Sequence, residues 1–307
     1  MREVSPTTGP EPDGPPTMSL LEGIVREVRP KQWAKNGLVF VAPGAAGILT
    51  TRYGFFHALI AFCVFSLAAG ATYLVNDVLD VEADRHHPRK RHRPIAAGVV
   101  PVPLALVLAA TFAVVAIGVA FWRAPQFGLV VVLYIVLTTL YSTYLKHQPV
   151  LDVMGLSSGF ILRLLGGAYA VSVAVSDWFL IISCFGALFI ATCKREAEKR
   201  EMGDGEAATR RLLSDYSTQY LGFLKSVATA LVLIAYCLFA VDKAHEDTSI
   251  AVWIELSIIP FVIAILRYAL LVDQGKGSAP EDVLLGDRQM QVLGLMWVVL
   301  MGLSVYG

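Results

Sequence analysis

Acidic side chains gather at one point of an otherwise apolar stretch, in the sequence Asn76-Asp77-x-x-Asp80-x-x-x-Asp84. On a helix these aspartates, at positions i, i+3 and i+7, lie on one face. Carboxylates placed in this way repel one another unless a cation lies among them, and hard oxygen ligands favour Mg²⁺. We therefore expect Asp77, Asp80 and Asp84 to bind Mg²⁺ and to act in catalysis, with Asn76 in the substrate site. The alternative is a solvated helix end whose acids cap the helix or form ion pairs.

A basic loop follows the aspartates over residues 86–98. Pro88 and Pro94 stop a helix here, so the loop brings several cations beside the expected metal site. Mg²⁺ and adjacent cations together form a clamp for a diphosphate, and Lys90 and Arg93 are predicted to bind substrate. The alternative is an ordinary cytoplasmic loop of a membrane protein, which is rich in positive charge.

The elements that position these residues are predicted to be membrane helices. Of the 307 residues 56% are hydrophobic and only 16% are charged, well below the roughly 25% of soluble proteins. The formal net charge is zero, so no basic field indicates nucleic acid as a partner. Because a span needs about 20 apolar residues, we expect an all-α integral membrane protein with about nine transmembrane helices. The predicted spans are 37–50, 57–80, 102–121, 127–145, 151–171, 178–193, 219–240, 251–271 and 290–306.

The distribution of Lys and Arg predicts the orientation in the membrane. With the N-terminus in the cytoplasm, the outer segments hold only Arg52, Arg123 and Lys243, as the positive-inside rule requires. The long polar loops 82–100, 194–218 and 272–289 then all face the cytoplasm. We expect a multi-pass protein of the cell inner (plasma) membrane with a cytoplasm-facing active site.

A single domain preceded by a short tail is expected. Residues 1–20 are rich in proline and polar residues and are predicted to be a disordered cytoplasmic tail. Residues 21–307 form a single transmembrane domain. Glycines such as Gly155 and Gly159 permit close helix packing, and they could build either a cavity or the interface of a homo-oligomer.

Three segments resemble the UbiA superfamily of membrane transferases. The aspartate stretch and a basic loop ending Arg93-Pro94-Ile95-Ala96-Ala97-Gly98 resemble that family's first aspartate-rich motif. The others are Arg29-Pro30-x-x-Trp33-x-Lys35-Asn36 and Tyr141-Ser142-x-x-Leu145-Lys146. The resemblance implies a UbiA-like bundle with a cytoplasm-facing cavity and Mg²⁺ as cofactor. It also implies that Lys31, Lys35, Tyr141 and Lys146 contribute to substrate binding.

The sequence departs from the family after the sixth span, where UbiA-type prenyltransferases carry a second aspartate-rich motif. Lys194, Arg195 and Glu198 stand there instead, and two cations at a membrane mouth suit an anionic group better than a second metal. This substitution resembles the decaprenyl-phosphate phosphoribosyltransferase branch, as do Phe160-Ile-Leu-Arg163 and Gly166-Gly167. Arg163 is a cation within a span and needs an anionic or carbonyl partner. The alternative is a structural pair with Asp152 or Asp177.

The branch implies a reaction that we expect here. The 5-phosphoribosyl group passes from phosphoribosyl pyrophosphate to a polyprenyl (decaprenyl) phosphate, releasing pyrophosphate and giving polyprenylphosphoryl-β-ribose 5-phosphate for cell-wall arabinan synthesis. One alternative is a UbiA-type prenyltransferase with a prenyl diphosphate donor and an aromatic or other acceptor. Another is a cation transporter lined by the aspartates, which the neighbouring cations oppose.

Overall fold

The structure, a computed structural model, describes residues 18–88, 90–201, 215–275, 283 and 286–307. Every regular element in this part of the chain is a helix, so the predicted fold class is confirmed. Residues 1–17 of the predicted tail, 202–214 of the predicted 194–218 loop, and 276–282, 284 and 285 of the predicted 272–289 loop lie outside the described residues. Helix α1 (Leu20–Glu27) begins where the tail was predicted to end, because the Ser19 hydroxyl caps it by accepting a hydrogen bond from the Glu22 amide.

Eight helices in the described part of the chain are long and apolar enough to cross a membrane. They are α3 (Arg52–Leu79), α5 (Val102–Arg123), α6 (Pro125–Thr143), α7 (Leu151–Ala170), α8 (Asp177–Glu201), α10 (Thr218–Glu246), α11 (Ala251–Leu256) continued by α12 (Ile258–Asp273), and α14 (Arg288–Tyr306). Eight of the nine predicted spans correspond to these helices.

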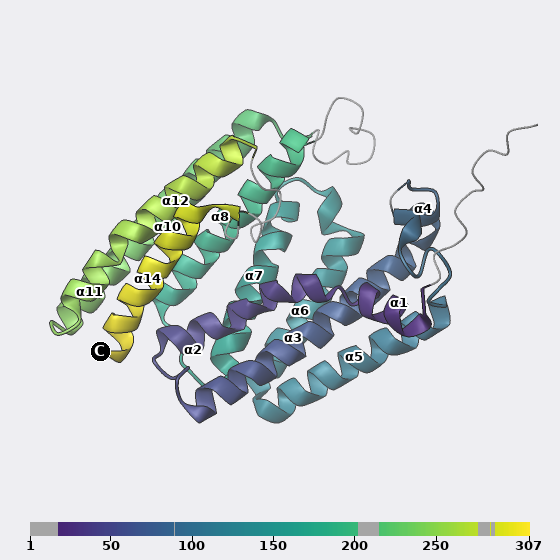
Figure 1. Cartoon of the computed structure of the whole chain (residues 1–307), viewed down its shortest axis with the longest axis horizontal. Coiled ribbons are helices and arrows are strands. Elements are labelled where there is room, and N and C mark those ends of the chain that lie inside the picture. Colours follow the sequence, from purple (N-terminus) through teal and green to yellow (C-terminus); the bar gives the residue numbers. More distant parts are fainter. Residues whose placement is uncertain (1–17, 89, 202–214, 276–282, 284–285) are drawn as a thin grey trace, which may run out of the picture.

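The first predicted span, 37–50, is built differently from the others. A 3₁₀-helix, η1 (Pro30–Phe40), leads into the five-residue helix α2 (Val41–Ala45), and the helix ends there. A 3₁₀-helix rises about 2.0 Å per residue and an α-helix about 1.5 Å, so these elements together extend roughly 30 Å. That is about the thickness of a bilayer core. The stretch runs alongside α3 (Figure 1), and the structure agrees with about nine helices.

The N-terminal half packs around α3. Phe65 of α3 is fully buried against Phe127 and Tyr134 of α6, with ring centroids 6.2 and 5.2 Å apart. A Cβ at Gly167 of α7 would lie 2.1 Å from the Val39 carbonyl oxygen of η1. The close packing of α7 against η1 at this position therefore requires a glycine.

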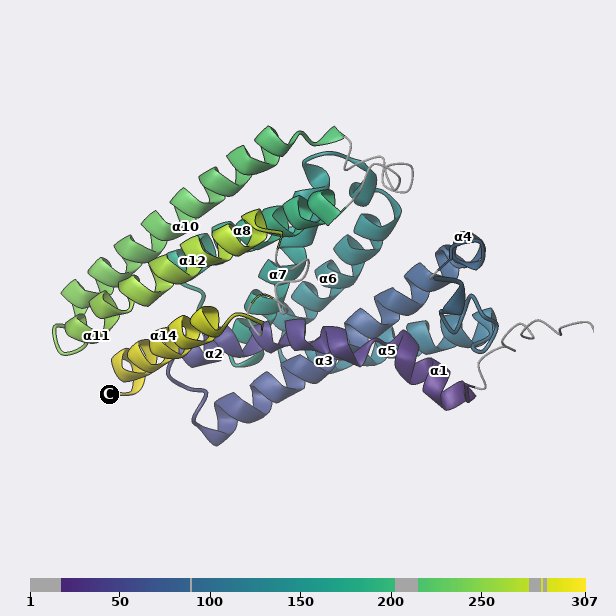
Figure 2. The same cartoon turned by 45° about the horizontal axis from the view of Figure 1, so that its top comes forward.

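The C-terminal half forms a second group of helices, α8, α10, α12 and α14 (Figures 1 and 2). Phe189 of α8 packs against Tyr268 of α12, with ring centroids 5.5 Å apart. An ion pair at 2.8 Å between the buried Glu196 and the half-buried Lys225 joins α8 to α10.

One end of the molecule collects the polar connections. Helix α4 (Val81–Arg85), the α6–α7 connection with η3 (Leu145–His147) and the C-terminal end of α8 lie on the same side in both views. The chain's C-terminus and α11 lie at the opposite end.

Candidate active site

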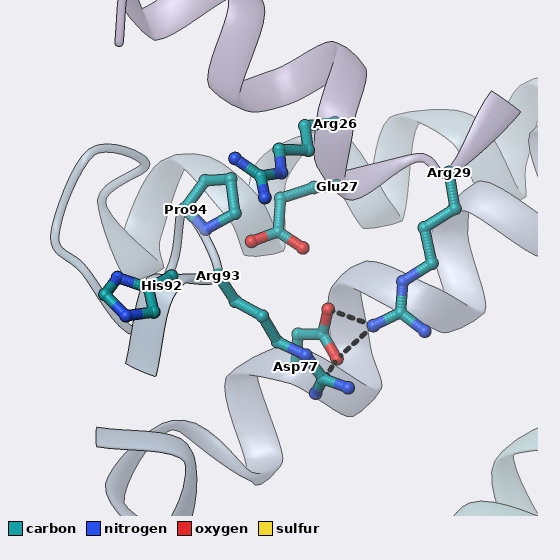
Figure 3. A pocket seen from close by; sticks show the side chains of 7 residues that line it. All are labelled: Arg26, Glu27, Arg29, Asp77, His92, Arg93 and Pro94. Carbon is teal, nitrogen blue, oxygen red and sulfur yellow. Dashed lines mark hydrogen bonds and ion pairs between the residues drawn. The ribbon is translucent and has the colours of Figure 1, made fainter. Parts of the chain in front are cut away.

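Asp77, in the last turn of α3, is the centre of the first polar cluster. Its side chain is 1% exposed. Arg29 Nη2 donates to both carboxylate oxygens, at 2.7 and 2.5 Å, and Arg93 Nη1 donates to Oδ1 at 3.0 Å (Figure 3). Two guanidinium groups therefore hold one buried carboxylate.

Asp84 converges on the same guanidinium nitrogen. Helix α3 ends at Leu79 and α4 begins at Val81, so the single helix predicted through Asp84 is interrupted at Asp80. Backbone bonds from the Asp80 amide and the Asp84 amide to carbonyls four residues earlier still span the junction. Asp84 Oδ2 consequently accepts from Arg93 Nη1 at 2.6 Å.

Asp80 is set apart from the other two aspartates. It is half-buried, and its Oδ2 accepts from Asn76 Nδ2 at 3.3 Å. The same amide donates weakly to Asp77 Oδ1 at 3.4 Å. Among the described residues no three acidic, histidine or cysteine side chains form a ready metal cage. The aspartates lie near one another, but only Asp77 and Asp84 point at a common cation.

The Asp77–Asp84 pair fits Mg²⁺ by its donor set. Two carboxylate oxygens face one positively charged nitrogen of Arg93, so their geometry already suits a cation between them. Mg²⁺ is commonly held by one or two carboxylates together with substrate phosphates and water, and needs no cage of three protein ligands.

Arg29 and Glu27 complete this cluster, and neither was predicted as a site residue. Glu27, the last residue of α1, is 2% exposed, and its Oε1 accepts from the Ile95 amide at 2.8 Å. Burial, followed by the neighbouring carboxyl of Asp77, raises the pKa of Glu27 to about 7. Because Arg29 and Asp77 are 48 residues apart, spacing alone could not have paired them.

These side chains line a cavity of about 270 Å³, and Figure 3 shows the carboxyl groups of Glu27 and Asp77 turned toward each other inside it. The lining residues are Arg26, Glu27, Arg29, Asp77, His92, Arg93 and Pro94. Three guanidinium groups against two carboxyl groups leave an excess of positive charge. The cavity therefore suits an anion better than a cation alone.

The predicted lysines occupy different places around this end of the molecule. Lys90 Nζ lies 3.9 Å from Asp84 Oδ1 and joins the first cluster. Lys35 Nζ donates at 2.6 Å to a glutamine on its own helix, while Lys31 is exposed on η1. Lys146 is half-buried on η3, and neither it nor Lys35 or Lys31 lines the cavity.

A second polar cluster surrounds Arg195 on α8. Its Nε and Nη2 donate to the two carboxylate oxygens of Asp152 at 2.6 and 2.7 Å, and Nη2 also donates to the Tyr141 hydroxyl at 2.5 Å. Nη1 donates to Glu198. The fork is thus filled by two carboxylates and a phenol, and Asp152 is fully buried. Sequence spacing offered no sign of this pairing, since Asp152 and Arg195 are 43 residues apart.

Lys194 and Glu198 lie at the edge of the second cluster. Lys194 Nζ is 4.0 Å from Glu198 Oε1, as expected for positions i and i+4 on one helix. Lys194 is 28% exposed, whereas the Arg195 side chain is 8% exposed. The three predicted residues therefore come together, with Lys194 as the more accessible cation.

Arg163 lies in the interior of α7 with neutral partners. Its Nε donates to Asn36 Oδ1 at 2.7 Å, Nη1 to the Gly159 carbonyl at 2.7 Å, and Nη2 to the Tyr134 hydroxyl at 2.8 Å. The alternative pairing with Asp152 or Asp177 is wrong, because all three guanidinium nitrogens of Arg163 donate to these neutral groups. Arg163 instead joins α7 to η1 and α6.

Comparisons with known proteins give a matching family and named relatives. The family model described as the UbiA prenyltransferase family matches residues 38–299. The chain is 43% identical over 295 residues to decaprenyl-phosphate phosphoribosyltransferase of Corynebacterium glutamicum, covering 95% of this chain and 89% of the relative. It is also 43% identical to the protein of that name from Mycobacterium tuberculosis, covering 94% and 96% of the two chains.

A solved structure shares the fold. The UbiA homolog from Archaeoglobus fulgidus, bound to GPP and Mg²⁺, matches with a TM-score of 0.67 at 16% sequence identity. The match covers 92% of this chain and 98% of that chain.

Proposed function

Because this chain belongs to the UbiA prenyltransferase family, we propose that it moves a 5-phosphoribosyl group from phosphoribosyl pyrophosphate to decaprenyl phosphate or a similar polyprenyl phosphate. The observation that carries the proposal is the near full-length similarity to two decaprenyl-phosphate phosphoribosyltransferases. The two polar clusters supply the chemistry that such a donor needs. One suits a diphosphate, and the other has basic residues for a separate phosphate.

The first cluster is assigned to the diphosphate of the donor. Arg29 and Arg93, now bound to Asp77, are the donors that would pass to the phosphate oxygens. Asp77 and Asp84 would then hold Mg²⁺, which neutralises the charge of the departing pyrophosphate. Lys90 adds a positive charge beside Asp84.

The second cluster is assigned to the 5-phosphate of the donor. Lys194 is the accessible cation there, and we assign it the contact with phosphate. Arg195 forms ion pairs with Asp152 and Glu198, so we assign it the role of holding the side chains of this cluster in place. Tyr141 joins the same network through its hydroxyl group.

The reaction is a displacement at the anomeric carbon. An oxygen of the lipid phosphate forms a bond to C1 of the ribose, and the bond from C1 to pyrophosphate breaks with its electron pair leaving on pyrophosphate. The lipid phosphate is an anionic nucleophile, so no side chain must remove a proton from it. Attack opposite the leaving group inverts an α-donor to a β-product. The side chains of the first cluster contribute by stabilising charge on the leaving group.

The polar end of the molecule is proposed to face the cytoplasm at the inner membrane. Both clusters lie on elements at that end. By sequence, the segments predicted to face the cytoplasm hold most of the Lys and Arg residues. A homo-oligomer remains a prediction.

A comparison of two donor and acceptor mixtures tests the proposed function. Purified protein with Mg²⁺ is given either phosphoribosyl pyrophosphate with polyprenyl phosphate, or a prenyl diphosphate with an aromatic acceptor, and mass spectrometry identifies the products. We expect polyprenylphosphoryl-ribose 5-phosphate from the first mixture alone. Product from only the second mixture would make the chain a prenyltransferase and overturn the proposal.

A further inference from the structure

Two arginines from segments far apart in the sequence form ion pairs with Asp77, and the side chain of Glu27 lies between those segments. Arg29 follows α1, whereas Arg93 lies in the loop after α4. Glu27 is two residues before Arg29, and its bonding partner Ile95 is two residues after Arg93. The Glu27–Ile95 hydrogen bond therefore fastens one arginine-bearing segment to the other.

The backbone at Arg29 requires such support. Its φ of +51° is in the left-handed region, which a side chain with a Cβ adopts only at an energetic cost. Arg29 connects α1 to η1. Trp33 Nε1 donates to the Val28 carbonyl at 3.0 Å and supports one side of the turn, while Glu27 supports the other.

Packing also presses α1 against the Arg93 loop. Val28, Ile95 and Val100 belong to one buried cluster. A Cβ at Gly23 would lie 3.0 Å from Val99, so little space separates the two segments. Within this apolar contact the Glu27 carboxyl is a buried polar group, and its bond to the Ile95 amide satisfies a backbone donor.

We propose that Glu27 is a positioning residue that fixes Arg29 and Arg93 at the spacing required to bind the donor's diphosphate. This assignment rests on the proposed function for the identity of the donor. The effect passes through the backbone, since Glu27 holds Ile95 and thereby the loop that carries Arg93. Its carboxyl group faces Asp77 in the cavity (Figure 3), so Glu27 would lie beside a diphosphate bound there. Glu27 itself would take no part in making or breaking a bond.

Two substitutions separate positioning from bulk packing. Glu27→Met keeps the length of the side chain and removes the acceptor for the Ile95 amide. Glu27→Gln keeps an acceptor oxygen at the same place. Glu22→Gln, on the exposed face of α1, is the matched control.

The first measurement is binding of Mg²⁺-pyrophosphate to each purified variant by isothermal titration calorimetry. This probe requires no turnover and does not depend on which donor the enzyme uses. We expect Glu27→Met to weaken binding by about tenfold, the order of a lost hydrogen bond to a charged group. Glu27→Gln should stay within about threefold of the parent, since the acceptor for Ile95 is retained.

The second measurement is the KM for each substrate. We expect Glu27→Met to raise the KM for phosphoribosyl pyrophosphate and to leave the KM for polyprenyl phosphate unchanged. A structural role alone would reduce the active fraction, lower the apparent kcat and change neither KM. Parent-like pyrophosphate binding and donor KM in Glu27→Met would overturn the proposal, as would equal damage from Glu27→Gln. Weakened pyrophosphate binding without any phosphoribosyl transfer by the parent would sustain this inference and overturn the proposed function.

Discussion

At the scale of single residues, the three aspartates at the α3–α4 junction have different hydrogen-bond partners. Asp77 and Asp84 both accept from Arg93 Nη1, whereas Asp80 accepts from Asn76. A carboxylate that faces a shared cation position has a direct electrostatic part to play in the site. A carboxylate that accepts a hydrogen bond from a neighbouring side-chain amide, as Asp80 does, affects the site only indirectly.

Asp84→Asn should therefore be far more damaging than Asp80→Asn. We expect Asp84→Asn to lower phosphoribosyl transfer by about 100-fold or more, and Asp80→Asn by less than about tenfold, because a directly placed electrostatic group is worth about 10²–10³ in rate. Initial rates at saturating Mg²⁺ measure this difference. Glu82→Gln, on the exposed face of α4, is the control. Equal losses for the two aspartates would refute the distinction.

Much of the first cluster followed from local spacing, since the aspartates and Arg93 lie within 17 residues and a helix with a proline-limited loop brings them near. Glu27 and Asp152 did not follow from spacing. Glu27 meets Ile95 across 68 residues and Asp152 meets Arg195 across 43, and these contacts arise from helix packing. One sequence carries no period that predicts such long-range pairs.

At the scale of elements, the helices predicted from apolar runs agree well with the structure except for the first. The apolar residues near 37–50 predicted a membrane span but not the 3₁₀-helix η1 that leads into it. A 3₁₀-helix rises more per residue than an α-helix, so it extends the element without requiring more apolar residues. Its packing partner is α7, where Gly167 allows the backbone of Val39 to approach.

Gly167→Ala should destabilise this contact. The new Cβ would overlap the Val39 carbonyl oxygen, and overpacking of a buried contact costs about 1–3 kcal/mol. Thermal unfolding in detergent should show a lower Tm than for the parent. Gly118→Ala on α5, where a Cβ meets nothing within 4 Å, should keep the parent's Tm. A parent-like Tm for Gly167→Ala would show that η1 and α7 are not packed as described.

The second cluster joins α7 to α8 through a buried ion pair. Asp152→Asn leaves the Arg195 guanidinium without its main counter-charge, and breaking such a pair costs about 3–5 kcal/mol. Asp152→Asn and Arg195→Met should each lower the Tm. Together they should lower it by less than the sum of the two changes, because the buried charges are removed as a pair. Additive losses would mean that the two side chains do not interact.

At the scale of the whole molecule, both clusters lie at the same end. The α10–α11 connection and the C-terminus lie at the opposite end, and the distribution of Lys and Arg predicts that the end with the clusters faces the cytoplasm. The distribution of Lys and Arg predicts the orientation because positively charged loops stay in the cytoplasm during membrane insertion. The fold alone does not indicate which end faces the cytoplasm.

Cysteine labelling in intact cells tests the orientation. In a variant with the four native cysteines replaced, Thr248→Cys in the α10–α11 connection should react with a membrane-impermeant maleimide. His147→Cys in the α6–α7 connection should react only after the membrane is permeabilised. The reverse pattern would place the active site outside the cell.

We propose that the Asp77 cluster carries out metal-dependent transfer of phosphoribosyl to a lipid phosphate. The most direct measurement follows radiolabel from phosphoribosyl pyrophosphate into the organic phase, with polyprenyl phosphate as acceptor, for the parent and for Asp77→Asn with unchanged Tm. We expect label with the parent and Mg²⁺, and none after EDTA or in Asp77→Asn. Undiminished transfer by folded Asp77→Asn would contradict this proposal.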